Sequence, residues 1–212
     1  MICSPATVGR GGGCSRIVNP IRATTFAFFL TGLISIQAAT PFKKTSGGGL
    51  LHAPSNVLFP SKVELFQRAD SYTQIYGSQG RDVSVRYLLD ALIICEVYVY
   101  PVGTYGTDLK SEFRIQQRAI TQINKQVKLL SQDSAHTNQR GQSMGGLHAN
   151  YELTRHLFSG KDQRCGSQLF VFRNGAWFVA YRFSYPREHP DIANKHVSDF
   201  LRGWDWKNYE ET

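Results

Sequence analysis

Two alternating apolar runs joined by Asn174-Gly175 constrain the fold of this chain more than any other feature of its sequence. The first run spans residues 168–173 and the second spans 176–185. Asn-Gly between two such runs favours a two-residue hairpin loop, because both loop positions need positive φ. This loop would pair Phe172 with Trp177 across the two strands. The pattern therefore predicts an antiparallel β-hairpin.

The predicted hairpin has one strongly aromatic face. Side chains alternate between the faces of a strand, so Arg182 and Ser184 point the other way. Seven residues share the aromatic face: Phe170, Phe172, Trp177, Val179, Tyr181, Phe183 and Tyr185. A face of this size indicates a core, which we expect to lie beneath the main helix.

The spacing of apolar residues predicts that helix over 108–131. Its stripe alternates steps of four and three residues, with Thr107 or Asp108 as the cap and Glu112 in the first turn. The stripe consists of Leu109, Phe113, Gln116, Ile120, Ile123, Val127 and Leu130. One apolar stripe is typical of a helix that lies on a sheet, and a coiled coil would need longer heptads.

The remaining elements complete an α+β pattern. Alternation predicts strands over 71–76, 83–88, 92–100 and 147–157, and Pro190 begins a C-terminal helix that ends near Arg202. Residues 133–146 are polar and glycine-containing, which indicates a loop. Consecutive hairpins favour an antiparallel β-sheet packed against one long helix and a C-terminal helix.

The first 39 residues have the composition of an export signal. They contain three arginines and no acidic residue, and the run 23–39 is uncharged and ends in small residues, with cleavage expected after Ala38 or Ala39. Translation from Val18 is an alternative start. The apolar run is also just long enough for an uncleaved membrane anchor, and a transit peptide has a similar composition.

The export signal sets the domain boundaries and the compartment that we expect. Residues 40–56 are a flexible linker, 57–206 a single α+β domain, and 207–212 a tail. The expected location is the periplasm or the exterior, with membrane attachment through the N-terminal segment as the alternative.

The charge argues against a nucleic-acid partner. The formal net charge is +8, and without the three N-terminal arginines 21 basic residues face 16 acidic ones. This mild excess is interleaved with polar residues and forms no basic cluster. We expect instead a small ligand or another envelope protein as partner.

Two cysteines follow the signal, and an oxidising compartment permits a disulfide between Cys95 and Cys165. The alternative is a buried thiol at Cys95 and an unpaired Cys165.

The chain shows no zinc signature, no P-loop and no dinucleotide fingerprint, so we expect no metal and no cofactor. His148, Glu152 and His156 are spaced too widely along a strand to hold one ion.

Residues 141–145, Gly-Gln-Ser-Met-Gly, match the nucleophile elbow of serine hydrolases, with Ser143 as the candidate nucleophile. An elbow needs a buried strand before the serine and a helix after it. Here the preceding residues are polar and the following ones alternate like a strand. A glycine- and serine-rich loop is therefore the favoured interpretation, and we predict no catalytic residue.

The region from Pro54 to Trp206 resembles the PsbP-like fold, and it is similar to uncharacterised exported bacterial proteins. The resemblance rests on VSVRYL, CEVYVYP, the long helix, and SQLFVFRNGAWFVAYRFSYP followed by a helix that ends in FLRGWDW. It implies a helix-flanked antiparallel sheet and a role in binding or assisting other proteins, and it implies no shared catalytic residues. A cystatin-like cone is the alternative fold.

Three functions follow from these observations. The first is a non-catalytic exported binding or envelope accessory protein. The second is a small exported serine hydrolase that uses Ser143. The third is a pocket-type ligand carrier or isomerase, whose cavity would be lined by Tyr87, Tyr98 or Trp177.

Overall fold

The structure, a computed structural model, describes residues 40–90, 92–139, 142–157 and 160–204. These residues form two helices and two antiparallel sheets. The small sheet has the order β1-β2-β3, and the large sheet has the order β4-β5-β6-β7-β11-β10-β9-β8. The elements are β1 (Phe42–Lys44), β2 (Leu50–His52), β3 (Val57–Phe59), β4 (Lys62–Val63), β5 (Phe66–Tyr76), β6 (Asp82–Leu89), β7 (Ile93–Pro101), α1 (Leu109–Ile123), β8 (Lys125–Gln139), β9 (Gln142–His156), β10 (Asp162–Asn174), β11 (Trp177–Pro186) and α2 (Pro190–Gly203).

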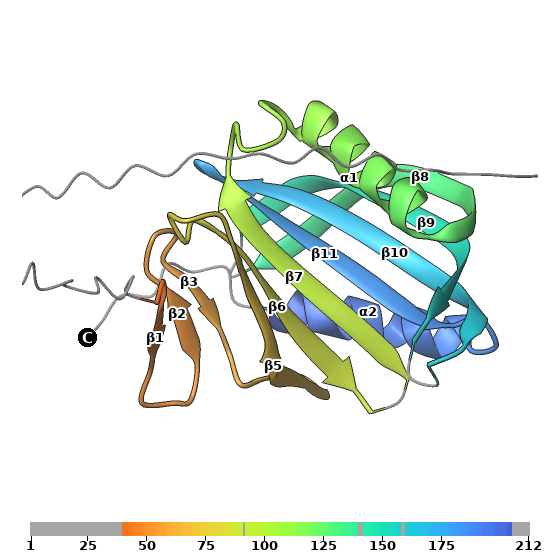
Figure 1. Cartoon of the computed structure of the whole chain (residues 1–212), viewed down its shortest axis with the longest axis horizontal. Coiled ribbons are helices and arrows are strands. Elements are labelled where there is room, and N and C mark those ends of the chain that lie inside the picture. Colours follow the sequence, from red (N-terminus) through yellow and green to blue (C-terminus); the bar gives the residue numbers. More distant parts are fainter. Residues whose placement is uncertain (1–39, 91, 140–141, 158–159, 205–212) are drawn as a thin grey trace, which may run out of the picture. The chain divides into compact units, whose positions relative to one another are not determined.

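The two helices lie on opposite faces of the large sheet (Figure 1). Phe113 and Ile120 of α1 pack with a cluster that includes Leu169 and Phe178. Phe200 of α2 belongs to a separate cluster on the other face. The α+β class and the antiparallel sheet are thus confirmed. In the part of the chain that is described, neither helix combines the length and the apolarity that a bilayer crossing requires.

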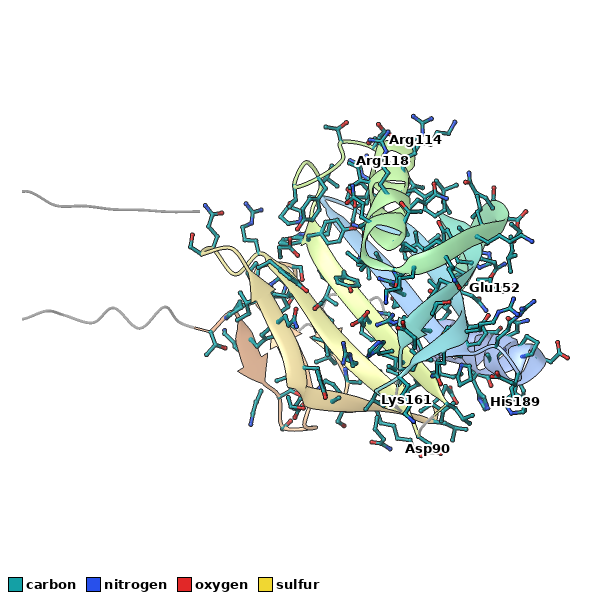
Figure 2. All side chains as sticks on the ribbon, turned by 45° about the vertical axis from the view of Figure 1, so that its right-hand side comes forward. Asp90, Arg114, Arg118, Glu152, Lys161 and His189 are labelled. Atoms are coloured by element: carbon teal, nitrogen blue, oxygen red, sulfur yellow. The ribbon has the colours of Figure 1, made fainter. Side chains whose placement is uncertain are left out.

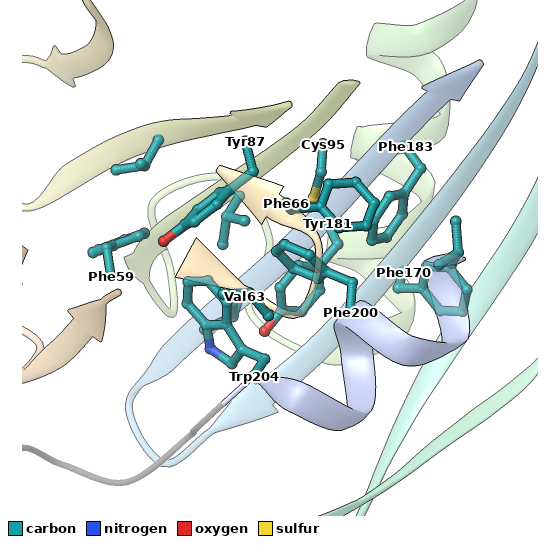
Figure 3. Packing of buried hydrophobic residues seen from close by; sticks show 14 of the residues in the cluster. Phe59, Val63, Phe66, Tyr87, Cys95, Phe170, Tyr181, Phe183, Phe200 and Trp204 are labelled. Atoms are coloured by element: carbon teal, nitrogen blue, oxygen red, sulfur yellow. The ribbon is translucent and has the colours of Figure 1, made fainter. Parts of the chain in front are cut away.

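The aromatic face of the β10–β11 hairpin is covered by α2, and the expectation that the long helix covers it was wrong. Phe200 contacts Phe66 and Phe183 with ring centroids 4.9 and 5.5 Å apart, and Trp204 contacts Tyr181 at 5.7 Å. Figure 3 shows this packing of α2 against the sheet. The sequence pattern predicted both helices, but it did not predict which helix covers which face of the sheet.

The β10–β11 hairpin exists, but its register differs from the expected one. The loop is Gly175-Ala176, so Phe172 pairs with Val179 instead of Trp177. Of the two residues that were expected to turn, Gly175 has positive φ, at 57°, and Asn174 does not. The change of register leaves the same seven residues on one face, because it moves the pairing by two positions.

The long helix is shorter than predicted. It ends at Ile123, where the Asn124 side chain donates to the Ile120 carbonyl oxygen at 2.7 Å. Val127 and Leu130 belong to β8, although their spacing continues the helical stripe. Residues 133–146, expected to be a loop, complete the β8–β9 hairpin apart from positions outside the described residues. Pairing with β9 stabilises these polar residues as a strand. The spacing of apolar residues along the sequence gives no sign of such a pairing.

Residues 40–56, expected to be a flexible linker, contain β1 and β2. Buried His52 holds this segment to the β5–β6 turn. Its Nε2 donates to the Gly80 carbonyl oxygen at 2.8 Å, and its Nδ1 accepts from the Ser55 hydroxyl at 2.6 Å. The expected export signal, residues 1–39, and the expected tail, 207–212, lie outside the described residues.

Candidate functional site

The start of α1 is fixed by a capping box. The Asp108 carboxylate accepts from the backbone N–H groups of Lys110 and Ser111 at 2.9 and 3.0 Å. The Ser111 hydroxyl accepts from the Asp108 N–H at 3.1 Å. These bonds satisfy N–H groups that have no partner within the helix, so the helix begins at a defined residue.

Glu112 then ties this end of α1 to the sheet. Its buried carboxylate accepts from the Tyr100 hydroxyl and the Gly106 N–H, both at 2.8 Å, and from Gln116 Nε2 at 2.7 Å. A Cβ at Gly106 would come within 2.5 Å of the Glu112 nitrogen, so the loop before the helix needs glycine there. The helix is therefore held at one end over β7.

A cavity of about 290 Å³ lies between α1 and the sheet, and we call it the tyrosine crevice. Its α1 side is largely apolar and is formed by Ile115, Ala119, Ile120 and Ile123. Four tyrosines line it: Tyr76, Tyr98, Tyr100 and Tyr105. Its volume is close to the lower limit of about 300 Å³ for small-molecule sites.

Asp82 and Tyr105 form a hydrogen-bonded pair at the crevice. The Tyr105 hydroxyl donates to the Asp82 carboxylate at 2.5 Å. Burial raises the pKa of Asp82, and the bond from Tyr105 acts in the opposite direction. Asp82 thus already has a donor, which occupies one of its carboxylate oxygens.

A row of charged side chains crosses the α1 face of the sheet. Arg86, Glu96 and Arg182 are neighbours in the registers of β6, β7 and β11. Glu96 accepts from Arg86 Nη2 at 2.6 Å. Burial opposes ionisation of Glu96, but the bond from Arg86 and the surrounding arginine charges outweigh it and lower the pKa. Arg182 also lines the tyrosine crevice and is only 7% exposed.

The structure places Ser143 in strand β9, opposite Asn138 of β8. The chain continues from Ser143 as a strand, whereas a nucleophile elbow continues as a helix. Gly141, the first glycine of the motif, lies outside the described residues.

Cys95 and Cys165 are both buried and unbonded. Cys95 belongs to the cluster beneath α2, and Cys165 belongs to the cluster beneath α1. The sheet separates the two thiols, so the disulfide that the sequence permits is not formed in this structure.

The three side chains weighed as metal ligands have other neighbours. The His148 ring stacks on Phe170 at 4.2 Å, and His156 Nε2 lies 2.7 Å from an Asp162 oxygen. Glu152, which Figure 2 labels, pairs with Arg164 and also accepts from Arg187 at 2.9 Å. Among the described residues, no group of three or more side chains is arranged to hold a metal ion.

The sequence located part of the crevice. Of the three residues that the sequence suggested for a pocket, Tyr98 lines the crevice. Tyr87 lies instead in the core beneath α2, and Trp177 packs against that core. Arg182 was assigned to the correct face but not to a site. A charged residue in the middle of an apolar strand was the signal that could have identified it.

No family model and no curated protein matches this chain. Solved structures show a partial similarity. The solution structure of cyanobacterial PsbP, CyanoP, from Synechocystis sp. PCC 6803 is 14% identical, covers 68% of this chain and 81% of its own, and has a TM-score of 0.41. The Saccharomyces cerevisiae Ran-binding protein Mog1p is 12% identical, covers 70% of this chain and 85% of its own, and has a TM-score of 0.38. The weak PsbP-like resemblance inferred from the sequence is thus found again, as a likeness of fold.

Proposed function

We propose that this chain is an exported, non-catalytic binding protein and that its ligand enters the tyrosine crevice. One observation carries the proposal. The cluster beneath α2 closes one face of the sheet with aromatic rings, whereas α1 leaves a tyrosine-lined cavity over the other. Apolar walls with a few polar groups are typical of small-molecule sites. The composition of residues 1–39 supports export to the periplasm or the exterior.

The partners of the polar groups support binding over catalysis. Glu112 accepts three hydrogen bonds and Asp82 accepts one from Tyr105. A general base needs a free lone pair directed at the substrate. The bonds engage both oxygens of Glu112 and one oxygen of Asp82.

A pocket isomerase is the second candidate, and one observation favours it. Burial raises the pKa of Asp82 at the wall of an apolar cavity, which is how a carboxyl group becomes a proton carrier near neutral pH.

Titration with a neutral, environment-sensitive fluorophore, N-phenyl-1-naphthylamine, tests the proposal on the purified full chain. Ala119→Trp places an indole in the crevice, and we expect it to weaken binding at least tenfold. Thr121→Trp is the matched control, because Thr121 is exposed on the same helix and does not line the crevice. Equal binding by the wild type and both variants would exclude the crevice as the site.

A further inference from the structure

We propose that the crevice ligand is an organic anion, with a carboxylate, phosphate or sulfonate group bound to Arg182 and an apolar or aromatic body held among the tyrosines. This inference rests on the proposed function and specifies its ligand class. It starts from an arginine that the fold buries without a counter-ion of its own.

Arg182 lies in the middle of β11, between Leu169 of β10 and Glu96 of β7. It is 7% exposed, and its Nε and Nη2 atoms are buried with no hydrogen-bond partner among the described residues. A buried guanidinium is normally paired, because removing its water without replacement is strongly unfavourable. Arg182 lines the crevice, and its Nε and Nη2 atoms are closed to solvent, so a ligand supplies the missing acceptors once the guanidinium turns toward the cavity.

The neighbouring charged groups do not supply hydrogen-bond acceptors to Arg182 Nε and Nη2. Glu96 accepts from Arg86 Nη2 and from the Tyr98 hydroxyl, the latter at 3.3 Å. Arg155 directs its Nη1 to the Ser184 hydroxyl at 2.9 Å. Within this charged row, the guanidinium groups of Arg86, Arg155 and Arg182 all act on the one carboxylate of Glu96. This local positive excess favours an anion.

The pKa of Arg182 agrees with this account. Burial lowers it most, and the charge of Arg155 lowers it further, whereas Tyr98 and Glu96 raise it. The guanidinium remains protonated in proteins, so the lowered pKa expresses the unfavourable environment of the cation. An anion at the crevice would relieve that environment, and the planar guanidinium can donate two parallel bonds to it.

The tyrosine walls define the rest of the ligand. Aromatic rings favour a flat apolar body, and a cavity of about 290 Å³ admits a small one. Asp82, the acidic group at the same cavity, is held by Tyr105. An uncharged ligand of the same shape would leave Arg182 unpaired, so the site should discriminate by charge.

Two fluorophores that differ by one sulfonate group test this discrimination on the full chain. These are 8-anilinonaphthalene-1-sulfonate, which is anionic, and the neutral N-phenyl-1-naphthylamine. We expect the wild type to bind the anion roughly tenfold to a hundredfold more tightly, as a buried hydrogen bond to a charged group implies. Arg182→Gln should remove this preference, so that the variant binds the two probes with similar affinity. Arg173→Gln, which removes an exposed arginine from the adjacent strand, should retain it.

The outcomes separate this inference from the proposed function. If neither probe binds, the proposed function fails. If both bind with equal affinity and Arg182→Gln changes neither, the crevice binds ligands but the anion inference is wrong.

A second measurement on the wild type covers the case in which Arg182→Gln does not fold. Benzoate should raise the melting temperature more than benzyl alcohol does, at equal concentration and matched ionic strength. Equal shifts with the two compounds would overturn the inference.

Discussion

Replacing Arg182 by methionine should make the ligand-free protein more stable. Methionine has a similar length and keeps the apolar stem among its neighbours, while it removes a charge that is buried without a full set of partners. Most substitutions of a buried residue destabilise, so the expected sign is unusual and informative.

The size of the effect follows from the groups that are removed. Two buried nitrogen atoms of Arg182 have no hydrogen-bond partner, and each costs about 1–3 kcal/mol. The substitution also removes the attraction between Arg182 and Glu96, which acts in the opposite direction. A net gain of about 2 kcal/mol lies within the range of about 1–4 kcal/mol observed when buried ion pairs are replaced by apolar residues. The comparison holds because Glu96 keeps its bond from Arg86 when Arg182 is replaced. For a chain of this size, that gain raises the melting temperature by roughly 4–8 °C.

Urea unfolding followed by tryptophan fluorescence measures this change, since buried Trp204 reports on the core. Arg86→Met is the matched control. Arg86 pairs with Glu96 at 2.6 Å and lies over the Tyr72 ring at 4.3 Å, so its loss should destabilise by about 2 kcal/mol because it leaves Glu96 without that partner. If Arg182→Met destabilises as much as Arg86→Met, Arg182 is well satisfied in the free protein, and the argument for an anion at the crevice fails.

Three further predictions concern other parts of the described fold. Glu112→Gln should lower the free energy of unfolding by about 2 kcal/mol, measured in urea, because a neutral amide replaces the carboxylate that three donors share; an unchanged midpoint would contradict the assigned anchoring of α1. Burial lowers the pKa of His52 and His148 in the folded state, so the unfolded chain binds protons first as the pH falls through about 6.5. Stability in urea should therefore decrease from pH 7.5 to pH 5.5, and the double variant His52→Phe, His148→Phe should flatten this dependence. A fluorophosphonate probe should not label the purified chain, and labelling that disappears in Ser143→Ala would instead establish the serine hydrolase.

The elements that the sequence predicted well are those whose signal is local. Pro190 marks the start of α2, and Asp108 caps α1 as its side chain allows. The same holds for the shared aromatic face of the β10–β11 hairpin, because alternation along a strand survives a change of register by two positions.

The elements that it missed depend on contacts between distant segments. Val127 and Leu130 fit a helical stripe, but pairing with β9 places them in β8. The structure of residues 40–56 depends on His52 reaching Gly80, a contact 28 positions along the chain. The crevice likewise depends on the bonds of Glu112, which hold α1 to the sheet. The spacing of residues within the helix does not predict those bonds.

Strand β11 explains how one sheet can be closed on one face and open on the other. Tyr181 and Phe183 point into the aromatic cluster beneath α2, whereas Arg182 and Ser184, which alternate with them, are buried on the α1 face. Because the aromatic cluster forms on the far side of the sheet, the α1 face can retain a cavity and an unpaired arginine without loss of the fold. With the proposed anion at Arg182, alternate residues of this one strand would serve stability and ligand recognition. Substitutions at Arg182 should accordingly change binding selectivity and stability in opposite directions, as expected for a residue retained for its ligand.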